Sequence, residues 1–276
     1  MKNLLFAKKI LLTAVIMLTT YTYSNATPLP IFSTSNGWTQ FANDDGYRTT
    51  DGYVNPGWGA QSFDAEHLFY KFQDNILSIG LQTGFDLIDG NVYTGGINYY
   101  AGDIALSFDG NSSNYEYAVD FGLFTKDYVT PSPVGGNTGT PGIDSAGVYS
   151  VSLWNNDVYG PYGSSKPFAM QSGTLLEQLS GNSSGSGSSG TSSSGGYFYG
   201  GYSYYRIVSV NTFYLPVIIP GNPIQLNAHW TMSCGNDAIN GSVTIPNPIP
   251  EPDTMFLLGS LATGLFGLAG ICKKRI

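Results

Sequence analysis

The sequence predicts an all-β domain, a sandwich or a barrel, enclosed by two terminal segments that do not belong to its fold. Three observations support this fold class. Short β-prone segments recur along the middle of the chain and are separated by turns rich in Gly, Asn and Asp. Helix signals are scarce before the C-terminal tail, and long apolar runs occupy the two ends. About 220 residues remain between the ends, enough to bury a core without disulfides.

Residues 1–26 have the order of a secretory signal peptide. Lysines come first, and the apolar run 10–18 follows. Ser24 and Ala26 then place small residues three and one positions before a cleavage point between Ala26 and Thr27. The apolar run is too short for a membrane-spanning helix, which needs roughly 20 residues. We therefore expect the exported chain to begin at Thr27.

Strand signals fill the domain that follows. Segments 68–72 and 76–81 flank a turn with Asp and Asn, and segments 104–108 and 115–121 flank an Asp-Gly turn, so each pair predicts a hairpin. Segment 148–154 alternates between Val or Ser on one side and Tyr, Val and Leu on the other, which is typical of a strand. Further β-prone segments cover 204–215, 224–232 and 242–245.

Two segments depart from this pattern. Residues 173–179 (GTLLEQL) are the one short helix candidate. Residues 181–196 (GNSSGSGSSGTSSSGG) are of low complexity and hold no large apolar side chain to bury. We expect a mobile loop there, inserted within a single domain that spans 27–245.

The C-terminal tail has the features of a membrane anchor. Residues 255–272 form a run of 18 residues without a charge, and Lys273, Lys274 and Arg275 follow at once. A run of this length is just sufficient to span a bilayer. The basic cluster should stay on the cytoplasmic side. A buried core helix would carry a polar face, which this run lacks.

Pro250, Glu251 and Pro252 stand immediately before the apolar run. With the helix and the basic end, this order resembles the PEP-CTERM sorting signal of exosortase-processed bacterial proteins, so we assign 246–276 to that signal. The prolines keep the segment extended, in a form that a processing enzyme can grip. The resemblance implies transient anchoring in the inner membrane, cleavage by an exosortase, and delivery to the cell surface or the extracellular exopolysaccharide. A plain anchor without cleavage is the alternative.

The exported part is strongly acidic. Of the 19 acidic residues of the chain only Glu251 and Asp253 lie outside residues 27–250, which hold 17 acidic and five basic residues, a net charge of −12. Lys and Arg are not clustered there, which excludes nucleic acid as a partner. Cys234 is the one cysteine of this part and Cys272 ends the apolar run, so a stapling disulfide is not expected.

A second resemblance concerns the exported domain. It rests on segments 55–66 (NPGWGAQSFDAE), 101–106 (AGDIAL) and 229–237 (HWTMSCGND). Their order resembles a group of exosortase-dependent surface proteins whose domain is similar to family 9 carbohydrate-binding modules and DOMON domains. The resemblance implies a jelly-roll-like β-sandwich. It does not by itself imply a sugar ligand, because function belongs to sites and not to folds.

Trp58 is the preferred aromatic ligand candidate, because it lies in a Pro/Gly loop where a ring is free to stack on a sugar. Trp154 and Trp230 lie in β-prone segments and are expected to pack in the fold. Four oxygen-bearing side chains complete the candidate ligand site, namely Asp64, Glu66, Asn236 and Asp237.

Calcium is the one cofactor that these residues suggest. Asp64, Glu66 and Asp237 supply carboxylate oxygens, which Ca²⁺ prefers. The EF-hand spacing is absent, and capping of turns by Asp and Asn is the alternative explanation.

We do not expect an enzyme. The two histidines, His67 and His229, lack a partner at zinc spacing, and there is no nucleophile-elbow sequence. The leading hypothesis is an exported, exosortase-processed surface or matrix protein with a structural or binding role. One alternative is a carbohydrate-binding module that retains the protein in exopolysaccharide. The second alternative is a secreted glycosidase or lyase.

Overall fold

A computed structural model describes residues 26–44, 53–54, 56–111, 113–123, 145–156, 158, 165–179, 183–189, 191–194, 197–215, 218–219 and 221–246. Most of the predicted signal peptide and the predicted tail from residue 247 onward lie outside these ranges. The tail includes the helix 255–272 and the sorting residues Pro250, Glu251, Pro252, Lys273, Lys274 and Arg275. Within the described ranges, no helix is long and apolar enough to cross a membrane.

The described chain is mostly strand, with a few short 3₁₀ helices. The strands are β1 (Thr39–Asn43), β2 (Ala65–Gln73), β3 (Ile76–Thr83), β4 (Asn91–Thr94), β5 (Ile97–Tyr100), β6 (Ile104–Ser107), β7 (Tyr117–Asp120), β8 (Gly147–Asn155), β9 (Ala169–Gln178), β10 (Ser183–Gly187), β11 (Thr191–Ser194), β12 (Tyr197–Gly200), β13 (Ser203–Asn211), β14 (Ile224–Thr231) and β15 (Ala238–Ile245). The 3₁₀ helices are η1 (Pro30–Phe32), η2 (Thr34–Asn36), η3 (Gln61–Phe63) and η5 (Thr212–Tyr214).

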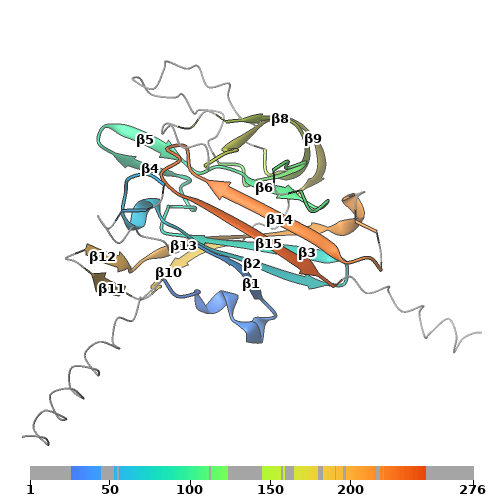
Figure 1. The fold of residues 1–276 in the computed structure, drawn as a ribbon, viewed down its shortest axis with the longest axis horizontal. Helices are drawn as coiled ribbons and strands as arrows, with labels where there is room; N and C mark the ends of the chain where they lie inside the picture. The colour runs from blue at the N-terminus through green and yellow to red at the C-terminus, as the bar shows by residue number, and fades with distance from the viewer. Residues whose placement is uncertain are drawn as a thin grey trace, which may run out of the picture.

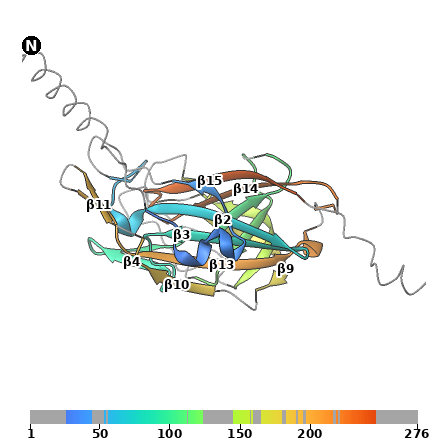
Figure 2. The ribbon, with the colours of Figure 1, turned by 90° about the horizontal axis from the view of Figure 1, so that it is seen from below.

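Two antiparallel sheets make up the body of the domain, so the all-β prediction is confirmed (Figure 1). The five-stranded sheet has the order β1-β2-β3-β13-β10, and the six-stranded sheet has the order β15-β14-β6-β7-β8-β9. Strands β4 and β5 pair separately, as do β11 and β12. Figure 2 shows β2, β3, β13, β14 and β15 running along the long axis of the domain.

The first predicted hairpin is present as β2 and β3. Asp74 and Asn75 form its turn with φ of 51° and 62°. Positive φ at both central residues is the geometry of a tight hairpin turn, which Asp and Asn tolerate better than most residues. The second hairpin is present as β6 and β7, and the alternating segment becomes β8, with Val148 in the main core and Tyr149 on the opposite face.

Two segments differ from the sequence-based expectation. Residues 173–179 lie mostly in strand β9 and not in a helix, because pairing along β8 outweighs the weak local helix preference of this stretch. The stretch 181–196, expected as a mobile loop, supplies β10 and β11. Backbone pairing with β13 needs no large side chains. At Gly185 a side chain would displace the Tyr205 ring, because a Cβ there would come within 2.7 Å of the Tyr205 hydroxyl oxygen.

The inner faces of the two sheets enclose one main core. Its largest fully buried side chain is Trp230, whose indole N–H donates to the Gly102 carbonyl at 3.0 Å. The ring packs at a steep angle against Phe85, with centroids 6.2 Å apart. A buried Trp with its N–H paired contributes much of a core's stability. The structure thus places Trp230 as expected, while Trp154 is half-buried in a small cluster on the outer face of β8.

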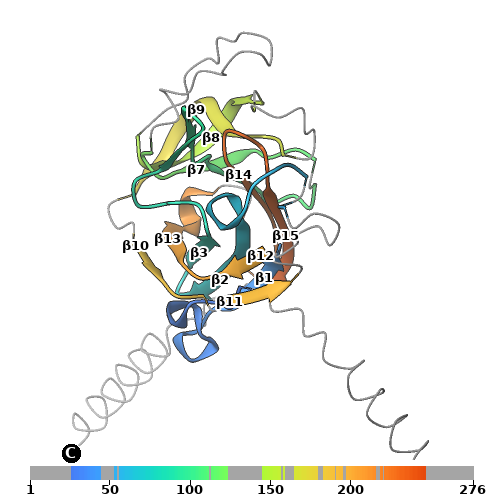
Figure 3. The ribbon, with the colours of Figure 1, turned by 90° about the vertical axis from the view of Figure 1, so that its left-hand side faces the viewer.

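The N-terminal segment covers the outer face of the five-stranded sheet. Phe32 stacks on Phe69 with centroids 4.2 Å apart and meets the edge of Trp38 at 5.2 Å. Gly80 of β3 permits this approach, because a Cβ there would overlap the Phe32 ring. Figure 3 shows the segment with η1 and η2 lying against β1 and β2. The segment from Leu29 to Trp38 is therefore part of the fold.

The domain has two different ends. Strand β15 begins beside Ala65, whose N–H donates to the Asp237 carboxylate at 2.7 Å, and it ends at Ile245. Its eight residues span about 25 Å. We call the end at Ile245 the tail end, because the predicted anchor follows it in the sequence. The opposite end holds η3, the β4–β5 hairpin and the start of β13 (Figure 1).

Candidate functional site

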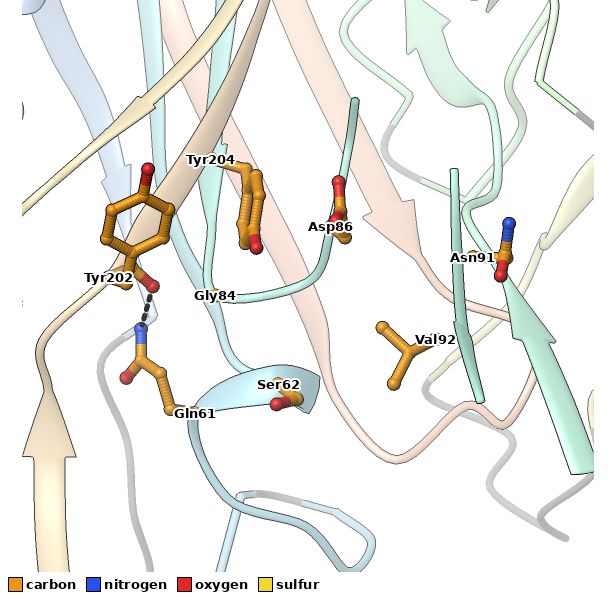
Figure 4. A pocket seen from close by; sticks show the side chains of 8 residues that line it. All are labelled: Gln61, Ser62, Gly84, Asp86, Asn91, Val92, Tyr202 and Tyr204. Carbon is orange, nitrogen blue, oxygen red and sulfur yellow. Dashed lines mark hydrogen bonds between the residues drawn. The ribbon is translucent and has the colours of Figure 1, made fainter. Parts of the chain in front are cut away.

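An open groove of about 330 Å³ lies at the end of the domain opposite the tail end. Four separate parts of the chain form it, namely η3, the segment after β3, strand β4 and the start of β13 (Figure 4). Its lining residues are Gln61, Ser62, Gly84, Asp86, Asn91, Val92, Tyr202 and Tyr204. Among these eight, Asp86 is the only one with a charged side chain.

Two tyrosines form the aromatic part of the groove. The rings of Tyr202 and Tyr204 meet edge to face, with centroids 5.5 Å apart and an interplanar angle of 79°. Tyr202 is exposed and Tyr204 is half-buried. Burial raises the pKa of Tyr204, and Asp86 raises it further by its charge and a hydrogen bond. The phenol therefore stays protonated and keeps its donor across the physiological pH range.

The groove wall beside Tyr204 is a turn that two side chains hold. One oxygen of Asp86 accepts the N–H groups of Ile88 and Asp89 at 2.8 and 3.0 Å. Arg206, two residues after Tyr204 on the same face of β13, donates from Nε to the Leu87 carbonyl at 2.7 Å. Together these hydrogen bonds fix the position of Asp86 in the groove.

Glu66 lies behind the groove and organises its support. Its side chain is fully buried, and its carboxylate accepts hydrogen bonds from Gln61, Ser203 and Gln82, each at 2.7 Å. Gln61 also donates to the Tyr202 carbonyl at 3.2 Å (Figure 4). A buried carboxylate needs such donors to remain in the fold. Through Gln61, the Glu66 carboxylate connects η3 with the start of β13.

The same support reaches the predicted start of the exported chain. Gln82 donates to the Thr27 carbonyl at 3.0 Å and accepts the Leu29 N–H at 2.8 Å. Thr27 donates from its N–H and its hydroxyl to the Ser189 carbonyl at 2.9 and 2.8 Å. The residues on either side of the predicted cleavage point, Ala26 and Thr27, therefore lie against the back of the groove.

Gly84 is required where the segment after β3 passes close to Gln61. A Cβ at this position would overlap the carbonyl oxygen of Gln61 and come within 2.6 Å of its side-chain nitrogen. Because the obstacle includes backbone, it cannot be relieved by a side-chain rotation alone. The close approach of the segment after β3 to η3 depends on this glycine.

The structure places the ligand-binding residues predicted from the sequence in separate surroundings. Trp58 is exposed, and its ring lies beside that of Tyr53 with centroids 5.0 Å apart. The Asn236 carbonyl accepts the N–H of Gly57 at 2.7 Å, so the loop of Trp58 packs on the turn before β15. Neither Trp58 nor Asn236 lines the groove.

The predicted carboxylates lie in two separate environments. Asp64 and Asp237 are buried together, and burial followed by the charges of Asp64 and Asp44 raises the pKa of Asp237 well above its usual range. The Asp237 oxygens accept the N–H groups of Ala65 and Ala238 at 2.7 and 2.9 Å. Glu66 instead turns to Gln61, Gln82 and Ser203. In the described part of the chain, no three His, Cys, Asp or Glu side chains are grouped to hold a metal ion.

The groups that a hydrolytic triad would use are held in other contacts. Cys234 is fully buried, and burial raises the pKa of its thiol to about 12. Nδ1 of His229 pairs with the Asn240 side-chain oxygen at 2.8 Å. Because a nucleophilic cysteine needs a thiolate and access to substrate, this thiol is a packing residue.

Sequence reasoning missed the groove residues themselves. Tyr202 and Tyr204 belong to a run with five tyrosines in residues 197–205, next to the Gly/Ser-rich stretch. That density of aromatics was visible, but it is equally typical of ordinary sheet faces. Asp86 and Asn91 stand in a turn and a short strand without any distinctive spacing.

No family model, curated protein or solved structure matches this chain.

Proposed function

We propose that the chain is an exported, non-enzymatic protein of the cell surface or extracellular matrix that binds carbohydrate in the groove of Tyr202 and Tyr204. The observation that supports binding is the combination of side chains in one open groove. Tyrosine faces pack on the C–H surfaces of sugar rings, and the Asn91 amide and the Asp86 carboxylate provide acceptors and donors for hydroxyl groups. The proposal is a form of the carbohydrate-binding-module alternative, with the ligand placed at Tyr202 and Tyr204 and not at Trp58.

A binding role is favoured over hydrolysis. Glycosidases use a pair of carboxyl groups on either side of the scissile bond. Among the eight described residues that line the groove, Asp86 is the only carboxylic acid. One of its oxygens accepts the N–H groups of Ile88 and Asp89, and a single carboxyl group does not make the pair that a glycosidase needs. The second alternative, a glycosidase or lyase, has no comparable support.

The jelly-roll-like class belongs to this proposal. Both large sheets are antiparallel, and the described chain passes between them from β3 to β6, from β9 to β10 and from β13 to β14. A sandwich of this kind presents loops at its ends, where binding residues commonly lie. The groove occupies such an end.

Export and sorting complete the proposal and rest on the sequence. The signal peptide directs the chain out of the cytoplasm, and the tail anchors a precursor in the inner membrane until an exosortase cuts near Pro250, Glu251 and Pro252. Intact-mass measurement of the protein purified from its native cells should give a chain that starts at Thr27 and ends near Pro250. A chain that retains residues 255–272 would favour the alternative of a plain anchor without cleavage. A chain that retains residues 1–25 would contradict cleavage of the signal peptide.

Groove variants test the binding function. On an array of neutral, amino and uronic-acid oligosaccharides, we expect binding to neutral or amino sugars, because the one charged lining residue is an acid. Tyr204→Ala and Tyr202→Ala should each lower the affinity about tenfold, since each removes one ring contact.

Tyr93→Ala is the matched control, because Tyr93 is an exposed tyrosine of β4 that does not line the groove. Its affinity should equal that of the unsubstituted protein. Repeating the array with Ca²⁺ and with a chelator tests the calcium hypothesis for Asp64, Glu66 and Asp237. Absence of signal in both conditions, or equal binding by the Tyr202, Tyr204 and Tyr93 variants, would refute the proposed groove.

A further inference from the structure

Three large side chains are exposed just after β13. Phe213, Tyr214 and Ile219 have 69%, 51% and 59% of their surface accessible. They flank Leu215, which is buried in the main core and fixes the base of the segment. We call Phe213, Tyr214 and Ile219 the apolar tip. Exposed apolar side chains grouped in one short segment are the kind of surface that a partner or a membrane contacts.

The apolar tip lies at the tail end of the domain. Thr212 donates from its N–H and its hydroxyl to the Asn75 carbonyl at 2.9 and 3.0 Å, which places the tip beside the β2–β3 turn. Ile224, at the start of β14, pairs with Ile245, the last residue of β15. The segment after β13 and the ends of β14 and β15 lie together in Figure 1, away from the β4–β5 hairpin.

The sequence places the predicted membrane anchor close to this end. Nine residues, 246–254, separate Ile245 from the apolar run 255–272, and four of the nine are prolines. Fully extended, nine residues reach about 30 Å. The tail end is therefore held within that distance of the bilayer while the precursor is anchored, and the groove lies at the opposite end of the domain.

The charge distribution suits a neutral or zwitterionic surface. Residues 207–236 contain no Lys, Arg, Asp or Glu, although the exported part as a whole carries a net charge of −12. Two acids lie close to the start of this segment, namely Asp74 in the β2–β3 turn and Glu177, whose carboxylate accepts the Asn211 N–H at 2.9 Å. Apolar and aromatic side chains, and not basic ones, are therefore the groups that this segment offers to a bilayer.

We infer that the apolar tip inserts into the headgroup region of the membrane that anchors the precursor. The inference depends on the anchoring tail proposed above and goes beyond the groove function. Contact at the tip orients the domain, so that the groove faces outward and the segment 246–254 lies near the bilayer surface. Release of the tail removes the tether, and three side chains are too few to retain the exported domain.

Site-specific labelling of the full-length chain tests this inference. An environment-sensitive fluorophore is attached to Phe213→Cys in a Cys272→Ser background; Cys234 is fully buried and out of reach of the reagent. The matched control carries the label at Tyr93→Cys, an equally exposed position (70%) at the opposite end. The chains are reconstituted in phosphatidylcholine vesicles that contain a lipid with a quencher near its headgroup.

We expect the label at position 213 to shift to shorter wavelength and to be quenched about twofold or more relative to position 93. Adding phosphatidylglycerol should weaken the effect, because Asp74 and Glu177 lie near the tip. A second label at Ile219→Cys should behave like position 213. If vesicle-bound chains show equal quenching at positions 213 and 93, insertion of the apolar tip is refuted and the predicted anchor still stands. Chains that do not bind vesicles would overturn the anchor as well.

A second copy of the chain is the competing occupant. If protein concentration in detergent without vesicles shifts the emission at position 213, the apolar tip is a contact between copies and the membrane inference is wrong. An unchanged spectrum under those conditions supports the bilayer as the occupant.

Discussion

Glu66→Ala is expected to destabilise the exported domain by about 3–5 kcal/mol, because it removes one charged acceptor from three donors and leaves a cavity where the buried side chain was. The carboxylate of this fully buried residue accepts from Gln61, Ser203 and Gln82. Removing a single buried hydrogen-bond partner costs about 1–3 kcal/mol, and here three donors lose the same acceptor. Urea denaturation of the exported chain measures the effect. The same variant should lose carbohydrate binding, because Gln61 no longer holds the start of β13.

Glu177→Ala provides the matched control. Glu177 is a half-buried glutamate whose carboxylate accepts the Asn211 N–H at the tail end. We expect a loss of about 1 kcal/mol and unchanged binding, since one partly exposed acceptor is removed far from the groove. Glu66→Gln keeps the volume of the side chain but replaces one acceptor oxygen by a donor. Its loss of stability should therefore lie between those of Glu66→Ala and Glu177→Ala. Equal denaturation midpoints for the Glu66→Ala and Glu177→Ala variants would contradict the role of Glu66.

Local features of the sequence predicted the strands and hairpins of the fold, but they did not predict the groove. Asp74 and Asn75 specify a tight turn by their own backbone preferences, so the β2–β3 hairpin was predictable without its neighbours. The groove instead brings Gln61 beside Tyr202, 141 residues later in the chain. Such proximity depends on the strand order, in which β13 pairs with β3. No short-range pattern encodes that order.

For the Gly/Ser-rich stretch, the prediction from composition was wrong for a different reason. Composition predicted a mobile loop, because this stretch has no apolar side chain to bury. Its backbone nevertheless pairs with β13 from Ser183 to Gly187 and extends the sheet. The large aromatic side chain of Tyr205 occupies the space that Gly185 leaves. Here the partner strand supplies the packing, so composition of the stretch alone misleads.

Acidification is expected to destabilise the folded domain through His67 by about 3 kcal/mol between pH 6.5 and pH 4. His67 is buried, and burial lowers the pKa of its imidazole from 6.5 to about 4, against a smaller opposing effect of the Ala26 carbonyl. Between these pH values the unfolded chain binds a proton that the folded chain does not. Stability is therefore complete above pH 6.5 and is lost as the pH falls toward 4.

A variant separates His67 from the other titrating groups. Asp237 has the opposite sign, because its raised pKa makes the folded chain hold a proton that the unfolded chain releases, so its contribution falls as the pH rises. The stability of the unsubstituted chain minus that of His67→Gln cancels such shared terms. We expect this difference to shrink by about 3 kcal/mol when urea denaturation is repeated at pH 4 instead of pH 7.

Tyr93→His is the control, since it adds a histidine at an exposed position whose pKa is the same in the folded and unfolded chains. Its stability difference from the unsubstituted chain should not change with pH. A constant difference for His67→Gln as well would show that the imidazole is already protonated in the fold, contrary to its buried setting.

The start of the exported chain sets the size of this acid effect. Nε2 of His67 donates to the Ala26 carbonyl at 2.8 Å, and this bond favours the charged imidazole. A chain cut between Ala26 and Thr27 lacks that acceptor, so the pKa of His67 falls further and the acid-sensitive range widens downward. Two chains that start at Ala26 and at Thr27 should therefore differ in stability below pH 4 but share the same slope above it. Because Thr27 keeps its bonds to Ser189 and Gln82, the groove itself should bind equally in both.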